Sequence, residues 1–426
     1  MIPFSFFFQK QNKRNKIHHH NKMSFRRFPA EYVSKHLHGL AVHSVLPAEA
    51  STTLIATHSG SFHCDEALAC SLLGHTAIGK EATIVRTRDP QVIDACGVVV
   101  DVGAVYDPSR HRYDHHQQTF HDCMQFTLNS YSPAKVKQYQ TRLSSAGLVY
   151  KHFGREVIAT FVRDAVQHSE VLQTLLQWPN DKKELSEREL DVLYTKMYEA
   201  FVEEVDGVDN GVECFSAVLS PAPTEPETSP VKAVLHRNYQ QSTSLSSRVG
   251  QLQTWWNEPQ ETENKETKEN MNFAEAMEMA GIAFFEKLFF YAFSWLPARG
   301  LVEDAFNARF TIDGGDSEGR IVVFHNSFCP WKDHLFTIEE EHAAENKSPI
   351  LYVLYSDGKG WRVQAVPKEV SSFESRKALP FKGLRDEELS AASGIEGGVF
   401  VHVSGFIGGM KTLEGALALA KKAIEA

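Results

Sequence analysis

A short stretch near residue 60 carries three side chains that could bind a metal ion. His58, His63 and Asp65 come soon after an apolar run from Thr53 to Ala56. Imidazole and carboxylate groups together suit Mn²⁺, Fe²⁺, Co²⁺ or Zn²⁺, and carboxylate-rich sites also admit Mg²⁺. On its own such a loop is more often structural than metal-binding, because polar residues favour loops. The stretch becomes a candidate site only if other parts of the chain supply further ligands.

Further ligand-type residues follow in three later segments. They are Asp101, Asp114, His115, His116, Asp206 and Asp209. Taken singly, the histidines could belong to a solvated loop, and the last two aspartates to the C-terminal turn of a helix. Residues three apart share one face of a helix, so Asp206 and Asp209 could act together. Agreement among several segments in residue type outweighs these separate interpretations and favours one shared metal site.

The surrounding elements predict an α/β fold. An apolar run, a glycine loop and then Ala67, Leu68 and Leu72 at helical spacing indicate strand, loop and helix. The β-branched run 97–100 suits a parallel strand that is buried on both faces. Ligands gather at the carboxyl ends of strands in open α/β sheets, so Asp101 is well placed for chemistry.

The C-terminal part predicts a second, smaller α/β domain. Segments 349–355 and 361–366 are typical strands joined by a turn, and a strand, a glycine loop and a helix follow 397. Gly405, Gly408 and Gly409 allow close backbone approach, and Lys411 lies at a helix N-terminus, which favours an anion. A plain loop before an amphipathic helix fits the composition equally well.

Length and composition indicate a globular protein of two domains. The chain has 426 residues, 42% of them hydrophobic, and a net charge of −10. That charge argues against coating nucleic acid by charge alone, yet neither proves nor excludes a nucleic-acid substrate. Its six cysteines form no CxxC pair, which fits reduced thiols in a cytosolic, nuclear or matrix compartment. The apolar stretch 288–298 is too short to span a bilayer, so no membrane partner is expected.

The first 50 residues differ from the rest. They carry eight Lys and Arg residues against two Glu, with Phe mixed in, which is typical of a mitochondrial presequence. The alternatives are a disordered tail, or a weak nuclear signal at residues 13–16. We expect the protein in the mitochondrial matrix, the nucleus or both, with the cytoplasm as an alternative. Met23 could serve as an alternative start.

Taken in order, these motifs resemble those of a known superfamily. The strings 57–67, 113–117, 204–211 and 402–409 are similar to those of the DHH phosphoesterases, and within them to the melanocyte-proliferating-gene exonuclease branch. The similarity covers roughly residues 51 to 426. It implies a parallel-sheet DHH-type metal domain at 51–257 and a DHHA1-like substrate domain at 301–426. Composition adds a presequence or tail at 1–50, a flexible loop near 219–231, and a polar linker and helix at 258–300.

The resemblance also implies roles for individual residues. Two divalent ions are expected, Mn²⁺ in preference to Mg²⁺. Their expected ligands are His58, His63, Asp65, Asp101, His115 and one of Asp206 and Asp209. Asp101 is expected to bridge the two ions, and Asp206 is preferred over Asp209 as the last ligand. It implies that His116 meets the scissile phosphate and that Asp114 orients the histidine pair. Substrate phosphates are expected on His402, Gly405, Gly408, Gly409 and Lys411. Arginines 86, 88, 110 and 112 flank the metal motifs, and Arg112 joins the expected phosphate-binding set.

The expected activity is hydrolysis of single-stranded RNA, or of DNA, from one end. A small-molecule phosphoesterase for pyrophosphate or short oligonucleotides is the alternative among enzymes. A metal-binding regulatory or scaffold protein is the alternative from another class. Met410 and Ser59 depart from the family pattern, since a polar residue and Asn are usual there. The metal, the polarity of digestion and the oligomeric state stay open.

Overall fold

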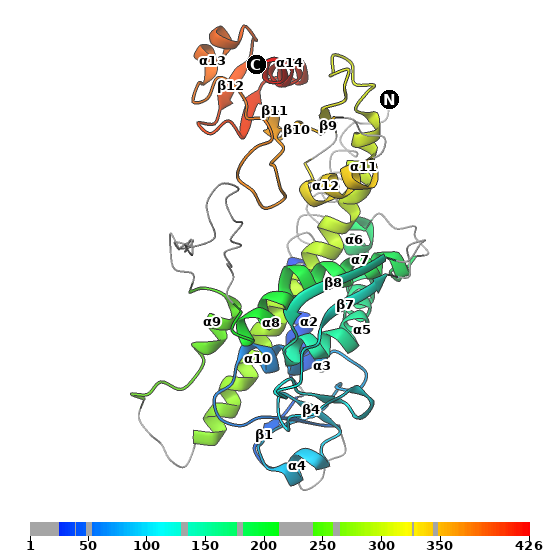
Figure 1. Ribbon diagram of the computed structural model, residues 1–426, viewed down its shortest axis with the longest axis vertical. Coiled ribbons are helices and arrows are strands. Elements are labelled where there is room, and N and C mark those ends of the chain that lie inside the picture. The colour runs from blue at the N-terminus through cyan, green and yellow to red at the C-terminus, as the bar shows by residue number, and fades with distance from the viewer. Residues whose placement is uncertain are drawn as a thin grey trace, which may run out of the picture. The chain divides into compact units, whose positions relative to one another are not determined.

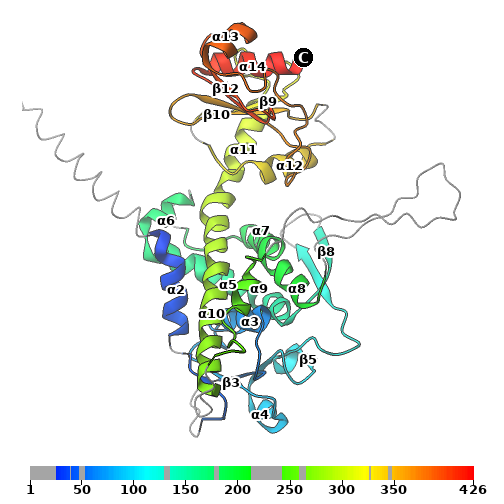
Figure 2. The same cartoon turned by 90° about the vertical axis from the view of Figure 1, so that its left-hand side faces the viewer.

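The protein has two compact units, one within Met1–Ala292 and one within Phe293–Ala426. Figures 1 and 2 show a computed structural model of the chain from two sides. The structure describes residues 25–38, 40–47, 53–128, 135–176, 182–212, 242–258, 265–325, 328–343 and 348–426. The expected loop at 219–231 lies outside the described residues, as do residues 1–24.

The first unit is built on a six-stranded sheet. Its strands are β1 (Val42–His43), β2 (Leu54–Thr57), β3 (Thr83–Arg86), β4 (Val98–Val100), β5 (Tyr106–Asp107) and β6 (Arg112–Tyr113). They follow the order β1-β3-β2-β4-β6-β5, and every neighbouring pair is parallel except β5 with β6. Strand β4 is buried along its whole length, as its β-branched residues predict. The α/β fold with a largely parallel sheet is therefore confirmed.

Helices surround this sheet and provide most of the unit's core. They are η1 (Phe25–Arg27), α2 (Phe28–Leu37), α3 (Cys64–Leu73), α4 (Pro90–Ala95), η2 (Pro108–Arg110), α5 (Ser145–His168), α6 (Glu170–Leu175), α7 (Glu187–Met197), η3 (Tyr198–Val202), α8 (Glu203–Asp209), α9 (Leu245–Gly250) and α10 (Lys265–Phe290). A hairpin of β7 (Cys123–Leu128) and β8 (Lys135–Arg142) lies apart from the main sheet. Every residue of α3 is buried, because α5 and α10 both pack against it.

Two segments that the sequence assigned to a tail and a linker contribute to this core. In α2, Tyr32 is 4% exposed, and its ring packs on Phe161 and Phe285. Strand β1 pairs with β3 at the edge of the main sheet. Helix α10 packs against both α2 and α3. The described residues from 28 to 47 and from 265 to 290 thus belong to the first unit.

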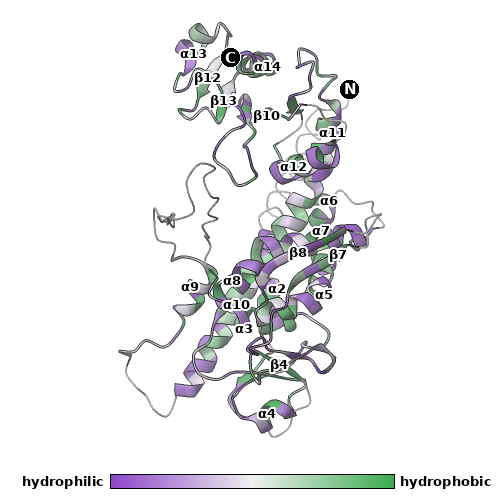
Figure 3. Ribbon diagram, in the orientation of Figure 1, coloured by the Kyte–Doolittle hydropathy of each residue, from purple (hydrophilic) through white to green (hydrophobic). Residues whose placement is uncertain are grey.

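The second unit contains a five-stranded sheet with helices on both faces. Its strands are β9 (Ile321–Phe324), β10 (Tyr352–Ser356), β11 (Trp361–Ala365), β12 (Gly398–Val401) and β13 (Ile407–Met410), in the order β12-β13-β11-β10-β9. Its helices are α11 (Leu296–Ala308), α12 (Lys332–Glu341), α13 (Asp386–Ser393) and α14 (Leu413–Glu425). Hydrophobic residues concentrate along the sheet and the inner faces of its helices (Figure 3). Gly408 and Gly409 lie within β13, whereas the sequence placed them in a loop.

One helical stretch runs from Lys265 to Ala308 and includes the π-helical turn η4 (Tyr291–Trp295). By length and composition it could cross a membrane, with a window of mean hydropathy 1.3, of which 56% is buried in the fold. Core helices of soluble proteins meet the same criterion, so this is weak evidence for a membrane span. The apolar stretch 288–298 is largely buried, as expected of a core helix.

Candidate metal centre

Loops at one edge of the first sheet bring the predicted ligands together. His58 follows β2, Asp101 follows β4, and the pair His115 and His116 follows β6, so all four lie beyond the carboxyl ends of parallel strands. Helices α3 and α8 add His63, Asp65, Glu66 and Asp209. These side chains form four overlapping groups, and within each group the ligand atoms lie within 4.8 Å of one another: His58, His63 and Glu66; Asp65, Glu66 and Asp101; His63, Asp65 and Asp209; and Asp101, His115 and His116.

Asp101 lies between two buried histidines. Its Oδ2 is 3.3 Å from His58 Nε2, and its Oδ1 is 3.4 Å from His115 Nε2. Its backbone adopts a φ of 57°, a left-handed conformation that is costly for a residue other than glycine. Ser145 at the start of α5 donates to Asp101 Oδ1 over 2.9 Å and fixes the carboxylate. A carboxylate in this position can bridge two cations.

The electrostatics of the cluster reflect this crowding. Burial lowers the pKa of His58, but hydrogen bonds with Asp101 and Glu66 outweigh that effect and raise the pKa to about 10. Burial likewise opposes the bonds of His115 with Asp101 and Asp209, which raise its pKa to about 9. Burial raises the pKa of Asp101, yet hydrogen bonds with the two histidines leave it below its usual range. The histidines therefore carry positive charge in the metal-free protein.

Asp65 provides the clearest indication that a cation belongs here. The residue is 1% exposed, and neither carboxylate oxygen has a hydrogen-bond donor among the described residues. Burial and the neighbouring carboxylates of Asp101 and Glu66 raise its pKa far above the usual range. A buried carboxylate without a donor is costly unless a proton or a metal ion compensates it. The donor set of imidazoles and carboxylates fits divalent transition metals and Mg²⁺.

His116 differs from the other histidines of the cluster because its ring faces solvent. The side chain is 60% exposed, and its Nδ1 lies 2.7 Å from Asp114 Oδ1. The hydrogen bond with Asp114 raises the pKa of His116. Asp114 is itself held by the backbone N–H of Ala104, which donates to its Oδ2 over 2.6 Å. This leaves the Nε2 side of His116 able to meet a substrate.

The structure separates the two aspartates of α8. Asp209 Oδ2 lies 3.1 Å from His115 Nε2, within the cluster. Asp206 is fully buried and accepts hydrogen bonds from the backbone N–H and the hydroxyl of Ser144, at 2.9 and 2.7 Å. Burial raises the pKa of Asp206 to about 7. The geometry thus favours Asp209 as the ligand, whereas the sequence preferred Asp206, which instead anchors α8 to the start of α5.

Glu66 belongs to the cluster although the sequence analysis missed it. Its Oε1 lies 2.9 Å from His58 Nε2, and both of its oxygens accept from the backbone N–H of His63, at 2.8 and 2.9 Å. This arrangement is the reciprocal cap of α3, in which the N-cap side chain and the third helical residue exchange hydrogen bonds. A polar residue followed three positions later by Glu at a helix start was the available signal.

The arginines near the motifs occupy different places. Arg112 donates to the backbone oxygens of Gly97 and Arg110, next to the amino end of β4 and away from the cluster. Its expected contact with phosphate is therefore not supported by its position. Arg88 is exposed and lies beside the cluster, with Nη2 3.1 Å from His58 Nδ1 and Nε donating to Ser59 O over 3.1 Å.

The expected phosphate-binding residues of the C-terminal part all lie in the second unit. His402 is exposed, and its Nδ1 is 2.9 Å from the Ser404 hydroxyl. Gly405 has a φ of 74°, which its missing side chain permits. Gly408 lies in β13, as does Gly409, and Lys411 is exposed just beyond the strand.

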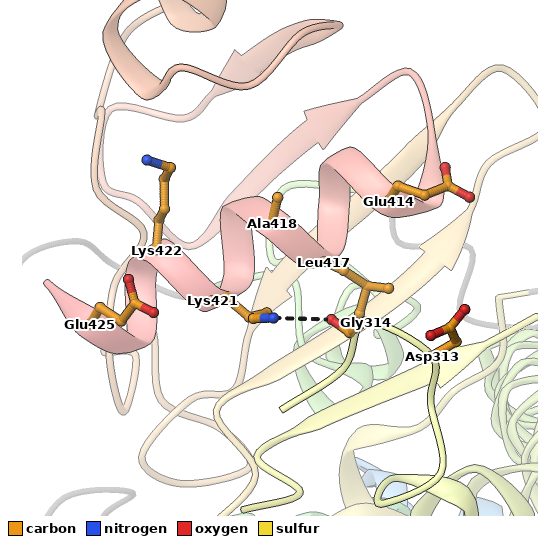
Figure 4. Close-up of a pocket in the computed structure, with 8 residues that line it drawn as sticks. All are labelled: Asp313, Gly314, Glu414, Leu417, Ala418, Lys421, Lys422 and Glu425. Carbon is orange, nitrogen blue, oxygen red and sulfur yellow. Dashed lines mark hydrogen bonds between the residues drawn. The ribbon is translucent and has the colours of Figure 1, made fainter. Parts of the chain in front are cut away.

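A cavity of about 380 Å³ in the second unit lies elsewhere, between α14 and residues 313–314. Figure 4 shows its acidic and basic side chains, among them Lys421, whose Nζ donates to Gly314 O over 3.5 Å. None of the expected phosphate-binding residues lines it.

Comparisons with known proteins agree with the motifs. A family model named MYG1_exonuc, described as an uncharacterised protein family (UPF0160), matches residues 54–424. The MYG1 exonuclease of Rattus norvegicus is 46% identical over 371 residues, 86% of this chain and 83% of the relative. The human MYG1 exonuclease is 45% identical over 374 residues, 86% and 84% of the two chains.

More distant relatives are covered over nearly their whole length. The MYG1 protein of Caenorhabditis elegans is 42% identical over 380 residues, 88% of this chain and 96% of the relative. No solved structure matches the chain. The extent of the family match and these identities show that the chain belongs to the MYG1 exonuclease family.

Proposed function

We propose that this protein is a metal-dependent phosphodiester hydrolase that shortens single-stranded nucleic acid, RNA in preference to DNA, from one end. The observation that carries the proposal is the buried carboxylate of Asp65, which has no donor among the described residues and lies beside four other side chains of metal-ligand type, His63, Glu66, Asp101 and Asp209. Relatives that bear the name exonuclease support the reaction class. The order of the motifs supports membership of the DHH phosphoesterase superfamily.

The proposed ligands of two ions are His58, His63, Asp65, Asp101, His115 and Asp209. Asp101 is the proposed bridging ligand, since it lies between His58 and His115. Two divalent ions held there would supply a water of lowered pKa and positive charge to stabilise the phosphoryl oxygens. Glu66 fixes the first turn of α3 through the His63 backbone, and Ser145 fixes the Asp101 carboxylate.

The chain's own groups supply orientation and charge around the phosphate. Asp114 accepts from His116 Nδ1, which directs the opposite side of that ring toward solvent and the substrate. The raised pKa of His116 keeps its Nε2 able to donate a hydrogen bond to a phosphate oxygen. Arg88 adds a guanidinium beside His58, so it is the better candidate for a phosphate contact than Arg112.

The second unit is proposed to hold the strand being degraded. His402 and Lys411 are exposed and cationic or polar, and the buried glycines Gly405, Gly408 and Gly409 between them let neighbouring groups pack closely on the backbone. The Arg362 side chain lies against Gly409. A Cβ added at Gly409 would come within 2.6 Å of Arg362 Nη1. These features support a phosphate-binding surface in the second unit. The basic composition of residues 1–50 supports a mitochondrial or nuclear location.

The proposal is tested by following an end-labelled single-stranded RNA with Mn²⁺ and with Mg²⁺ on a denaturing gel. We expect progressive shortening from one end by the wild type, and none by Asp101→Asn or in excess chelator. A chain that binds Mn²⁺ but leaves RNA and DNA intact while it hydrolyses pyrophosphate or dinucleotides would be a small-molecule phosphoesterase. Metal binding without hydrolysis of any phosphodiester would instead indicate a regulatory protein.

A further inference from the structure

One face of the five-stranded sheet carries a row of aromatic and arginine side chains. Strand pairing lines up Tyr355 with Arg362, Arg362 with Gly409, and Gly409 with Phe400, and an isolated bridge adds Arg385 beside Phe400. Side chains of directly paired residues point to the same face of a sheet. These five residues, here called the aromatic–arginine row, therefore form one line across β10, β11, β13 and β12.

The members of the row contact one another through planar groups. The Arg362 guanidinium lies over the Phe400 ring, 5.4 Å from its centroid, and Arg385 lies 5.9 Å from the same centroid. An added Cβ at Gly409 would come within 2.6 Å of Arg362 and 2.9 Å of Phe400. Glycine at 409 is therefore what lets a guanidinium and a ring lie flat across β13. The Phe328 ring extends the row beyond Tyr355, with centroids 4.7 Å apart.

This part of the sheet face is not sealed by the described helices. Helices α11 and α12 share a core with Val322 and Val353, so they cover the β9 and β10 end of this face. Helices α13 and α14 pack in the core on the opposite face. Tyr355 and Phe400 are only half-buried. Phe328 is 55% exposed and the Arg385 side chain 67% exposed, so flat surfaces remain accessible to a partner.

We propose that the aromatic–arginine row binds the bases of single-stranded nucleic acid by stacking, an inference that rests on the proposed function and specifies how its substrate is held. Aromatic rings and guanidinium planes both stack on unpaired bases, whereas bases in a duplex are already stacked. Neighbouring strands are about 4.8 Å apart, so a row across four strands spans roughly 15 Å. A nucleic-acid-binding sheet of similar width stacks two or three bases.

Charge favours the same partner. The protein carries a net charge of −10, so binding a polyanion requires positive groups at the point of contact. Arg362 and Arg385 provide two such groups within the row itself, each with a carboxylate beside it, Asp357 and Asp386 respectively. Arg362 also pairs with Asp357, which fixes its guanidinium in place. Arg362, a fixed planar cation against the Phe400 ring, extends the flat surface of the row and carries donors for phosphate.

The test measures binding without cleavage, using the full chain in chelator and two fluorescent 12-residue probes of equal charge. One is oligouridylate and the other has the same backbone without bases. We expect wild type to bind the first more tightly. The double variant Tyr355→Leu, Phe400→Leu should weaken binding of oligouridylate about 5- to 100-fold. It should leave binding of the abasic probe unchanged, because leucine retains bulk but offers no ring.

Matched variants make the result specific. Phe373 is fully exposed in the same unit and outside the row, so Phe373→Leu should bind both probes as wild type does. Tyr355→Phe with Phe400→Trp keeps the rings and should retain affinity for oligouridylate. Arg385→Gln should weaken binding of both probes and reduce its salt dependence. Thermal unfolding of every variant shows whether the second unit remains folded.

Some outcomes would overturn the inference. The first is that the leucine double variant binds both probes as wild type does, and the second is that it binds both equally more weakly. The third is that the double variant changes its oligomeric state, which would assign the row to a protein partner. If base-dependent binding is seen but neither RNA nor bis(p-nitrophenyl) phosphate is cleaved, the proposed function is wrong, while the proposal that the row binds bases still holds. If both are cleaved and the double variant binds oligouridylate normally, only the row is rejected.

Discussion

Three buried carboxylates, those of Asp65, Glu66 and Asp101, converge at the centre of the first unit. Like charges at such separations are unfavourable unless protons, cationic side chains or metal ions compensate them. His58 and His115 provide positive charge on two sides, but in the described part of the chain no donor reaches the Asp65 carboxylate. A cluster that only stabilised the fold would be expected to satisfy that carboxylate.

Replacement of single aspartates in α8 should separate a ligand from an anchor. Asp209→Asn is expected to lower the affinity for Mn²⁺ by about tenfold or more, because its Oδ2 lies beside His115 in the cluster. Asp206→Asn should leave that affinity nearly unchanged, because Asp206 contacts Ser144 instead and an asparagine Oδ1 can still accept the same two hydrogen bonds. Isothermal titration calorimetry with Mn²⁺ checks both. Equal losses in the two variants would contradict the assignment.

Metal binding should depend on pH with a predictable sign. The pKa values of about 10 for His58 and about 9 for His115 lie above neutrality, so both rings are protonated in the metal-free protein at pH 7. A metal ion must displace these protons, so its affinity should rise as pH increases toward 9. The increase is about tenfold per pH unit for each proton released.

Calorimetry in two buffers of different ionisation enthalpy counts the protons directly. We expect release of one to two protons per protein molecule on Mn²⁺ binding near pH 7. An affinity that does not change between pH 6.5 and 8.5, with no proton release, would show that the histidines are already neutral in the metal-free protein.

The sequence identified residue types well but distinguished poorly between neighbouring acidic residues. The predicted ligands at 58, 63, 65, 101 and 115 do lie together in the structure. Asp206 and Asp209 share one face of α8, and only the packing of that helix against α5 shows which one reaches the cluster. Glu66 was missed because a helix-capping Glu and a metal ligand have the same sequence pattern.

At the level of elements, the junction between α5 and α8 holds the metal centre in place. Ser144 is the N-cap of α5 and binds Asp206 of α8. The next residue, Ser145, binds Asp101 at the end of β4. Two adjacent serines therefore connect a strand end and two helices at one point. Displacement of the start of α5 should disturb all three together.

Gly147 offers a direct test of this junction. An added Cβ there would lie 2.4 to 2.7 Å from the carboxylate atoms of Asp206, which is too close without movement. Gly147→Ala should destabilise the protein by roughly 1–3 kcal/mol, as overpacking of a core does. It should also weaken Mn²⁺ binding, because the start of α5 positions Ser145. Denaturant unfolding and calorimetry measure the two effects.

A helix glycine in open space serves as the control. Gly250 lies at the end of α9 with no atom within 4 Å of an added Cβ, so Gly250→Ala should change stability by less than about 1 kcal/mol. If Gly147→Ala behaves like Gly250→Ala in both measurements, the junction does not support the metal centre in the way described.

Among elements, local patterns predicted the strands better than the tertiary role of some segments. The runs 97–100 and 361–366 contain β4 and β11, and the run 349–355 covers all but the last residue of β10, because apolar β-branched residues suit buried strands. The basic composition of residues 1–50 concealed α2, whose buried Phe28 and Tyr32 pack on α5 and α10. The buried residues Phe28, Tyr32 and Val33 do have helical spacing, but in a helix of ten residues this signal is short and the basic composition outweighed it.

At the level of the whole molecule, the two units carry different chemistry. Every described group of metal-ligand type lies in the first unit. The aromatic–arginine row and the expected phosphate-binding glycines lie in the second. A small phosphodiester needs only the metal centre, whereas a long strand gains affinity from remote contacts. Substrate size should therefore reveal what the second unit contributes.

Gly409→Ala tests this division of labour. The added Cβ would collide with Arg362 and Phe400, so the row can no longer lie flat across β13. We expect kcat/KM for single-stranded RNA to fall about tenfold or more, mainly through KM, because remote binding energy is lost. Hydrolysis of bis(p-nitrophenyl) phosphate with Mn²⁺ should stay within about twofold of wild type. Gly300→Ala, in open space on α11 of the same unit, is the control and should leave the activity on both substrates unchanged. An equal fall for both substrates would mean that the second unit supports the metal centre itself, and the assignment of separate roles would then be wrong.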